Sequence, residues 1–210
     1  MLNNIECLGH ATIKMSDSDK IIYIDPYNIG ESNSNADLIF VTHSHYDHFS
    51  EEDILKVKKE NTKIIVTEDL YQKTLELGFE EENITTVKPS EEYQIENIKF
   101  STVSSYNVNK KFHPKENNWV GYIIEINNVK YYIAGDTDIT EDNKKIKCDV
   151  AFLPVGGTYT MTAEEAAELA NTIQPKIVVP IHYGSIVGTQ EDAEKFKENL
   201  NSTVQCKLMM

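Results

Sequence analysis

The sequence lacks a long apolar run, a basic or apolar leader, and any cysteine pair with metal-ligand spacing. No apolar stretch approaches about 18 residues, so we expect no membrane span. Residues 1–6 have neither a basic start nor an apolar core, so we expect no secretory leader and a cytoplasmic protein. The three cysteines, Cys7, Cys148 and Cys206, are far apart, and we expect them to be reduced, buried thiols.

The chain also lacks an excess of positive charge. Its net charge is −14, from 20 basic and 34 acidic residues. Nucleic-acid binding relies on neutralising phosphates, so we expect no nucleic-acid partner and no ribonuclease activity. A small-molecule substrate fits better, and it can itself be anionic if a metal holds it. The 210 residues suit one domain, 1–210, or two tightly merged halves. The oligomeric state stays open.

One six-residue stretch holds half of the six histidines in the chain. It contains His43, His45 and His48 together with Asp47. The apolar stretch 37–42 before it predicts a buried strand, and Ser50 with three acidic residues after it predicts a helix start. A strand-to-helix turn lets these side chains converge. Imidazoles and a carboxylate suit zinc, iron or manganese, so the pattern predicts a metal site.

Two more polar side chains follow apolar strands. Asp136 ends the stretch 131–136, and His182 follows the stretch 177–181. Taken alone, Asp136 can be a turn residue and His182 a hydrogen-bonded structural histidine. With the turn from His43 to His48 (the histidine turn) present, we expect both to be metal ligands. Ligands at several strand ends can meet at one edge of a sheet core.

The remaining pattern predicts a mixed α/β protein. We expect a helix over residues 50–60 with Ile54, Leu55 and Val57 inward, and a hairpin through Asn127-Asn128. A capping box at residues 162–165 predicts a helix that ends near residues 174–175. The number of strands and helices indicates two packed sheets with helices outside.

Three motifs together resemble the metallo-β-lactamase-fold hydrolase superfamily. They are the sequence from His43 to His48, Gly135-Asp136-Thr137, and residues 180–184 around His182. Gly9-His10-Ala11 and residues 156–161 are similar to a branch of small bacterial and archaeal hydrolases. That branch includes proteins similar to the ascorbate-6-phosphate lactonase and the N-acylphosphatidylethanolamine phospholipase D. The resemblance implies a single-domain α/β fold, a four-layer αββα sandwich with the metals at one edge of the sheets.

The resemblance also implies metal roles. His43 and His45 would hold the first ion, Asp47, His48 and His182 the second, and Asp136 would bridge them. One or two divalent ions are expected, zinc first, with manganese, nickel or iron also fitting.

The superfamily usually supplies a third histidine to the first ion, and this chain departs from that pattern. The corresponding position holds Asn107, a poor zinc ligand. His113, six residues later, is either the missing ligand, a proton donor to the substrate or a mobile loop residue. The first metal site is therefore open to question.

His10 and a group of lysines have open roles. His10 either faces the substrate, supports the metal ligands or is structural, and a carboxylate such as Asp25 is a candidate to orient it. Lys110, Lys111 and Lys115 form either an ordinary solvated loop or a positively charged lid suited to a phosphate or carboxylate substrate.

The expected chemistry is hydrolysis of a small ester, lactone or phosphodiester by metal-activated hydroxide. Asp47 would hold the hydroxide and take a proton, and His113 or Tyr183 would protonate the leaving group. Two alternatives are weighed against it. One is a di-iron redox protein of the same fold, and the other is a regulatory module that binds metal without turnover.

Overall fold

The computed structural model describes residues 1–17 and 20–210. The chain divides into two compact units, Met1–Lys88 and Pro89–Met210. Each unit holds one β-sheet with helices, so the described residues form a mixed α/β fold with two sheets and four α-helices, as expected. Among them, no helix is long and apolar enough to cross a membrane.

The first unit contains a six-stranded sheet in the order β1-β2-β3-β4-β5-β6. Strands β1 to β3 pair antiparallel, and β3 to β6 pair parallel. The strands are β1 (Ile5–Gly9), β2 (Thr12–Asp17), β3 (Lys20–Ile24), β4 (Ala36–Phe40), β5 (Lys58–Thr67) and β6 (Ile84–Val87). The helices are α1 (Glu51–Val57) and α2 (Tyr71–Glu76), with short 3-10 turns η1 (Glu68–Leu70) and η2 (Glu81–Asn83).

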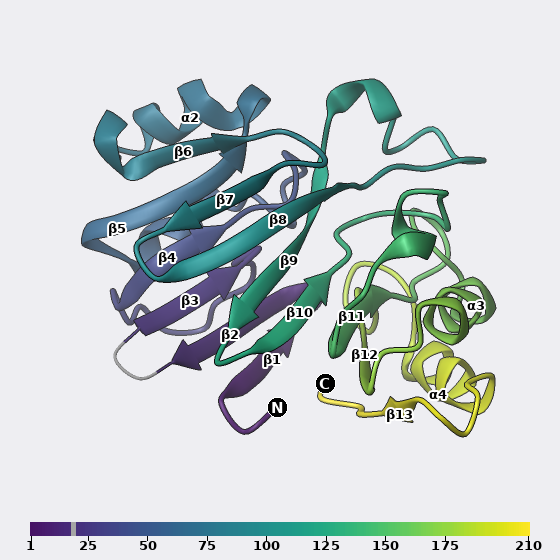
Figure 1. Ribbon diagram of the computed structural model, residues 1–210. Helices are drawn as coiled ribbons and strands as arrows, with labels where there is room; N and C mark the ends of the chain where they lie inside the picture. Colours follow the sequence, from purple (N-terminus) through teal and green to yellow (C-terminus); the bar gives the residue numbers. More distant parts are fainter. Residues whose placement is uncertain (18–19) are drawn as a thin grey trace. The chain divides into compact units, whose positions relative to one another are not determined.

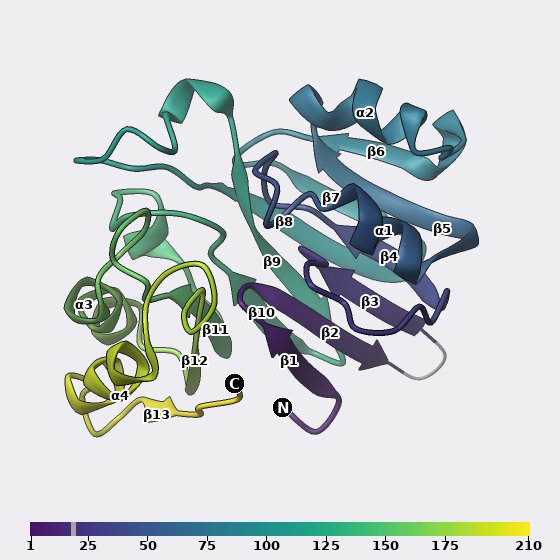
Figure 2. The ribbon, with the colours of Figure 1, turned by 180° about the vertical axis from the view of Figure 1, so that it is seen from behind.

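Helices α1 and α2 cover one face of this sheet (Figures 1 and 2). Ile54 and Val57 of α1 are fully buried in a cluster with alternate residues of β4 and β5, such as Ile39 and Ile64. Parallel strands with apolar residues on both faces are typical of α/β folds. This packing fixes the carboxyl ends of β3 and β4, where the site residues follow.

The second unit contains a seven-stranded sheet in the order β13-β12-β11-β10-β9-β8-β7. Strands β7 to β10 pair antiparallel, and β10 to β13 pair parallel. The strands are β7 (Glu92–Ile95), β8 (Ile98–Ser104), β9 (Val120–Ile126), β10 (Val129–Ile133), β11 (Val150–Pro154), β12 (Ile177–Ile181) and β13 (Gln205–Cys206). The helices are α3 (Ala163–Ile173) and α4 (Gln190–Glu198), with 3-10 turns η3 (Lys115–Asn117) and η4 (Asn143–Lys145).

Local sequence signals explain several of these boundaries. Asn127 and Asn128 both take the left-handed backbone of a two-residue hairpin turn between β9 and β10, as expected. Thr162 and Glu165 form the expected capping box of α3. Helices α3 and α4 lie beside each other next to β11 and β12 (Figures 1 and 2), and their buried residues share one hydrophobic cluster.

Two details of the sequence prediction were wrong. Helix α1 ends at Val57 rather than residue 60, because Lys58 takes an extended backbone and opens β5. The Lys58 ammonium donates to the carbonyl of Gly78, which ties this end to the turn after α2. Leu55, expected to face inward, is 48% exposed.

The three cysteines are free thiols, but each is half-buried rather than fully buried. Burial raises the pKa of Cys7 and of Cys148 to about 12 and the pKa of Cys206 to about 11. Burial therefore disfavours the thiolate, which is the reactive form of each side chain.

Asp53 joins helix α1 to the loop after β3. Its carboxylate accepts hydrogen bonds from the backbone N–H groups of Asn28 and Ile29, at 2.8 and 2.9 Å, and from Ser50 and Lys56. Burial alone would raise the pKa of Asp53, but these hydrogen bonds outweigh it and hold the pKa below its usual value. Asp53 therefore stabilises the fold above the carboxyl pKa of the unfolded chain, and this stability is lost as the pH falls through the lower folded pKa.

Asp53→Asn is therefore expected to lower the free energy of unfolding by about 2 kcal/mol at pH 7, because an amide cannot accept all four hydrogen bonds. Urea unfolding measures this. The loss should shrink as the pH falls below the carboxyl pKa of the unfolded chain, about 4, and should disappear below the lower pKa of the folded protein. The exposed neighbour Glu52, as Glu52→Gln, is the control and should change stability by less than 0.5 kcal/mol by the usual size of surface effects. Equal losses in the two variants would contradict the prediction.

Candidate metal centre

Three site residues directly follow strands and share an uncommon backbone conformation. His10 follows β1, Asp25 follows β3, and His182 follows β12. Their φ angles are +50°, +46° and +60°, in the left-handed region that non-glycine residues seldom adopt. All three are at most 3% exposed. Strained backbone at buried polar residues is typical of functional sites.

Asp25 organises the histidine turn of the first unit. Its carboxylate accepts the Thr42 backbone N–H at 2.8 Å and the Thr42 hydroxyl at 2.7 Å. Its Oδ2 also lies 2.7 Å from Nδ1 of His48. Because a carboxylate only accepts, Nδ1 of His48 carries the hydrogen, and Nε2 bears the lone pair.

The same network fixes the ring of His43. The hydroxyl of Thr42 gives its hydrogen to Asp25, so its oxygen accepts from Nδ1 of His43 at 3.0 Å. His43 therefore also presents the lone pair of Nε2. That atom lies 3.1 Å from Nδ1 of His45, the neighbouring ring in the turn.

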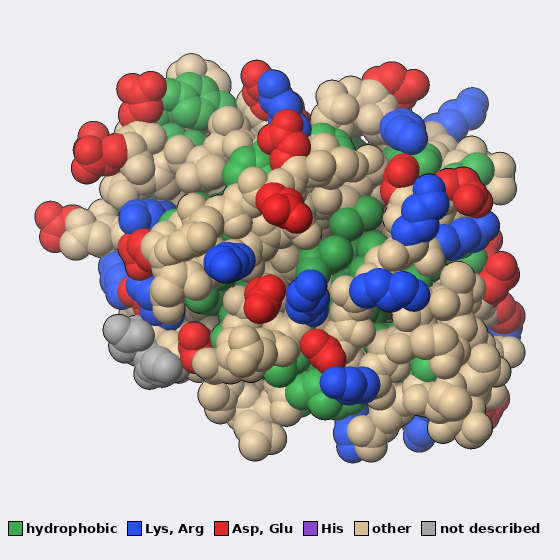
Figure 3. Space-filling view, in the orientation of Figure 1, with side chains coloured by type: hydrophobic (Ala, Val, Ile, Leu, Met, Phe, Trp, Pro, Cys, Tyr) green, Lys and Arg blue, Asp and Glu red, His purple; other side chains and the backbone are tan. Residues whose placement is uncertain are grey.

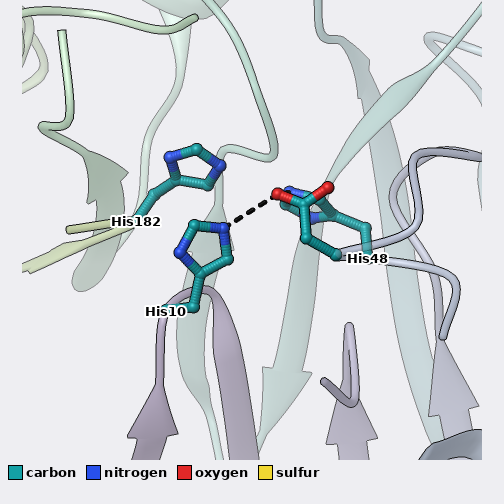
Figure 4. Close-up of side chains that lie close together, drawn as sticks. His10, His48 and His182 are labelled. Atoms are coloured by element: carbon teal, nitrogen blue, oxygen red, sulfur yellow. Dashed lines mark hydrogen bonds and ion pairs between the residues drawn. The ribbon is translucent and has the colours of Figure 1, made fainter. Parts of the chain in front are cut away.

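His10 contacts a different carboxylate from the one expected. Its Nε2 lies 2.9 Å from Oδ2 of Asp47, and the dashed line in Figure 4 marks this contact. Asp25, suggested by the sequence as its partner, instead contacts His48. The ligand atoms of His10, Asp47 and His48 lie within 4.8 Å of one another. His10 thus fixes the orientation of the Asp47 carboxylate within the histidine turn.

In the second unit, the carboxylate of Asp136 lies close to two histidines. Oδ2 of Asp136 lies 3.2 Å from Nε2 of His113 and 3.2 Å from Nε2 of His182. These side chains come from the loop after β8, the end of β10 and the end of β12, and all three are buried. His113 is therefore not a mobile loop residue, which was one of the three readings of the sequence.

Asn107 explains how His113 is held. Its Nδ2 donates to the carbonyl of Tyr159 at 3.0 Å, so its Oδ1 faces the histidine. Oδ1 accepts from the backbone N–H of His113 and lies 3.0 Å from its Nδ1. Nδ1 of His113 therefore carries the hydrogen, and Nε2, which faces Asp136, bears the lone pair. Asn107, at the position where the superfamily usually has a histidine ligand, therefore orients the ring of His113.

Tyr183 and Gly156 surround His182. Tyr183 is 3% exposed and lies in the hydrophobic cluster of the second unit, and its role as proton donor stays a prediction. A Cβ atom on Gly156 would lie 2.5 Å from the carbonyl oxygen of His182. Only glycine lets the backbone pass this close, so Gly156 fixes the turn that presents His182.

The spacing of these atoms fits metal coordination. Two neighbouring ligands of one octahedral or tetrahedral ion, bound at about 2.0–2.1 Å, lie roughly 2.8–3.4 Å apart. The His43–His45, His113–Asp136 and His182–Asp136 separations of 3.1, 3.2 and 3.2 Å match this range. The donor set of imidazole nitrogens and carboxylate oxygens suits a first-row divalent metal. Each unit therefore has side chains arranged for a cation.

Comparison with known proteins identifies the family. Residues 4–182 match the model of the β-lactamase superfamily domain. The chain belongs to this superfamily. A UPF0173 metal-dependent hydrolase from Thermococcus onnurineus is 31% identical over 92% of this chain and 90% of its own length.

Solved structures of metallo-β-lactamase-fold proteins support the same family assignment. A protein assigned as a metal-dependent hydrolase from Parabacteroides distasonis has a TM-score of 0.81 and 30% identity, over 97% of this chain and 91% of its own. The chain thus has the metallo-β-lactamase fold, as the sequence motifs predicted, and belongs among the UPF0173 metal-dependent hydrolases. CmlA, a diiron β-hydroxylase from Streptomyces venezuelae, shares the fold alone, at 14% identity and a TM-score of 0.73, over 98% of this chain and 52% of its own.

Proposed function

We propose that this protein hydrolyses a small ester, lactone or phosphodiester with the help of one or two divalent metal ions. The proposed ligands are His43, His45, Asp47 and His48 in the first unit, with His113, Asp136 and His182 in the second. The observation that carries the proposal is the set of hydrogen bonds that leave the Nε2 lone pairs of three histidines ready for a metal, namely those of His43, His48 and His113. Such supporting contacts are typical of metal-binding imidazoles.

When bound, a divalent ion polarises the scissile group and lowers the pKa of water from about 16 to about 7. Asp47 takes up a proton in the proposed reaction, since its carboxylate lies beside the ligand His48. The hydrogen bond from His10 fixes the orientation of Asp47 and so directs the oxygen that accepts the proton. With His113 assigned as a ligand, Tyr183 is the remaining candidate to protonate the leaving group.

We further propose zinc as the native metal, with manganese, iron or nickel as alternatives of similar ligand preference. The acidity of the chain supports a small-molecule substrate rather than a nucleic acid, and a cytoplasmic setting agrees with half-buried, unreactive thiols. Asp136, with a carboxylate close to two histidines, is the proposed bridging ligand.

Metal removal tests the proposal. Protein treated with a chelator and desalted is expected to lose at least 99% of its turnover of an ester or phosphodiester substrate, and zinc or manganese should restore it. Metal analysis of the untreated protein should find one or two ions per chain. Full activity without metal contradicts the proposal. Bound metal with no turnover across a broad panel of esters and phosphodiesters favours a regulatory protein.

A di-iron redox function is the second candidate. The fold likeness to the diiron β-hydroxylase favours it, although likeness at this identity concerns the fold alone. The absence of a third histidine spoke against it in the sequence, but His113 beside Asp136 removes that objection. Iron in the purified protein with an optical band that bleaches on reduction would support the redox function over hydrolysis.

A further inference from the structure

The second unit has a cavity of about 810 Å³ whose walls carry four lysines. Its lining comes from two loops, 106–116 after β8 and 139–144 after β10. All 20 basic residues of the chain are lysines, and a fifth of them, Lys110, Lys111, Lys115 and Lys144, line this cavity. Two glutamates, Glu116 and Glu141, line it as well, so the lining carries a net positive charge in a chain of net charge −14.

Contacts of Lys110 with Asp138, just before the second loop, and of Lys115 within the first loop hold the walls in place. The ammonium of Lys110 lies 2.6 Å from Oδ1 of Asp138, and Oδ2 of the same carboxylate accepts the backbone N–H of Val108 at 2.9 Å. The ammonium of Lys115 lies 4.5 Å above the ring of Tyr106 and 3.3 Å from its hydroxyl. Cavity walls that are fixed before binding lose less entropy when a ligand enters.

The lysines differ in how their charge is balanced. Among the described residues, Lys111 makes no ion pair or hydrogen bond, and its side chain is exposed. Lys144 pairs with Glu141 at 2.9 Å, but both side chains are exposed and water screens the pair. The ammonium of Lys115 lies 3.5 Å from Oδ2 of Asp142, which does not line the cavity, so the charge of Lys115 is also partly balanced. Figure 3 shows several lysine side chains on the right of this face, where Figure 1 draws the loops around η3 and η4.

One cavity residue leads directly to the proposed metal ligands. Asn107 lines the cavity, and its Oδ1 lies 3.0 Å from the ring of His113. His113 in turn lies 3.2 Å from Asp136. A molecule seated in this cavity therefore lies next to the loop that presents a metal ligand, and the volume is in the usual range for small-molecule sites.

We infer that this cavity binds the phosphate or carboxylate group of an anionic substrate and so places its scissile bond at the metal centre. The binding of the anionic group rests on the cavity alone. The placement of the scissile bond rests on the proposed hydrolase function. Lysine ammonium groups donate to phosphate and carboxylate oxygens and attract them through charge. An acidic chain would otherwise repel such a substrate.

Binding is tested without turnover. Metal-loaded protein is titrated with inorganic phosphate, and separately with acetate, while backbone amide signals are followed by NMR. Signals of residues 106–116 and 139–144 are expected to shift. In the double variant Lys111→Gln/Lys144→Gln, the dissociation constant should rise at least fivefold, since each charge contributes about fivefold near the surface. Lys110 and Lys115 are left intact because they hold the walls.

The double variant Lys145→Gln/Lys147→Gln is the matched control. Both lysines follow Lys144, are exposed and do not line the cavity, so this variant also removes two positive charges. Its dissociation constant for phosphate should stay within twofold of the wild type. Equal weakening in both variants, or none in either, overturns the inference. A stronger effect on phosphate than on acetate identifies a phosphate-bearing substrate, and the reverse identifies a carboxylate.

Kinetics separate this inference from the hydrolase proposal. With a pair of esters that differ only in a terminal carboxylate or phosphate, the double variant should raise KM for the charged ester at least fivefold. The KM of the double variant for the neutral ester, and its kcat for each of the two esters, should stay within twofold of the wild-type values. If neither ester is hydrolysed by the wild type, the hydrolase proposal fails, while the phosphate titration still decides the cavity. Equal KM changes for the two esters overturn the inference.

Discussion

Asp136→Ala is expected to lower hydrolysis at least a thousandfold and to reduce the metal bound per chain. Asp136 places one oxygen 3.2 Å from each of two histidines, so its loss removes a ligand and separates the pair. Asp136→Asn should behave similarly, because a neutral amide is a poor ligand for these metals. Metal analysis and turnover of an ester substrate measure both effects, and thermal unfolding confirms that the variants are folded.

Asp149→Asn is the control for Asp136. Asp149 lies just before β11, at the opposite end of the parallel strands, where it pairs with Lys176 and accepts the backbone N–H of Lys130. Its loss should leave metal content and turnover unchanged. An Asp136→Ala variant with wild-type metal content and activity would exclude this residue from the centre.

Asp25→Asn is expected to weaken metal binding 10- to 100-fold, although Asp25 is not itself a proposed ligand. Its carboxylate accepts from Thr42 twice and faces Nδ1 of His48. When the NH2 group takes the place of Oδ2, it faces Nδ1 of His48, which must then accept. The His48 hydrogen moves to Nε2, and the lone pair proposed for the metal is lost. When the NH2 group takes the place of Oδ1, it opposes the backbone N–H of Thr42 and displaces the turn that carries the ligands. Competition with a coloured chelator measures the affinity.

Asp25→Ala should add a stability loss of about 3–5 kcal/mol, since it leaves three donors of a buried network without an acceptor. Asparagine tolerates the left-handed backbone at this position, so Asp25→Asn separates the effect on metal from the effect on folding. Asp37→Asn serves as control, because Asp37 lies in the same sheet and pairs with Lys59. Asp25→Asn protein that binds metal as the wild type does would show that the network is structural only.

The site residues that follow strands could be predicted from the sequence, because an apolar run and the polar residue after it are both local signals. Apolar runs such as 177–181 indicate buried strands, and the polar residue that follows each run must lie at the edge of a sheet. The helix limits were less predictable. Leu55 fits a helical period, but exposure depends on which face meets the sheet, and α1 stops at Val57 because β5 begins there.

The contacts among loop residues could not be predicted, because they depend on tertiary structure. His113 is six residues from Asn107, and no periodicity indicates that the amide of Asn107 would turn the ring toward Asp136. Similarly, the sequence offered Asp25 as a partner of His10, and only the path of the chain after β1 and β3 shows that His10 contacts Asp47 and that Asp25 contacts His48.

The left-handed backbone of His182 opposes thermal stability to activity. Glycine adopts this conformation without strain, whereas a side chain costs roughly 1–3 kcal/mol there. Laboratory evolution for thermal tolerance alone would therefore favour glycine at a position that the proposed chemistry needs. A screen that selects for melting temperature should include an activity step, or it will enrich robust but inert chains.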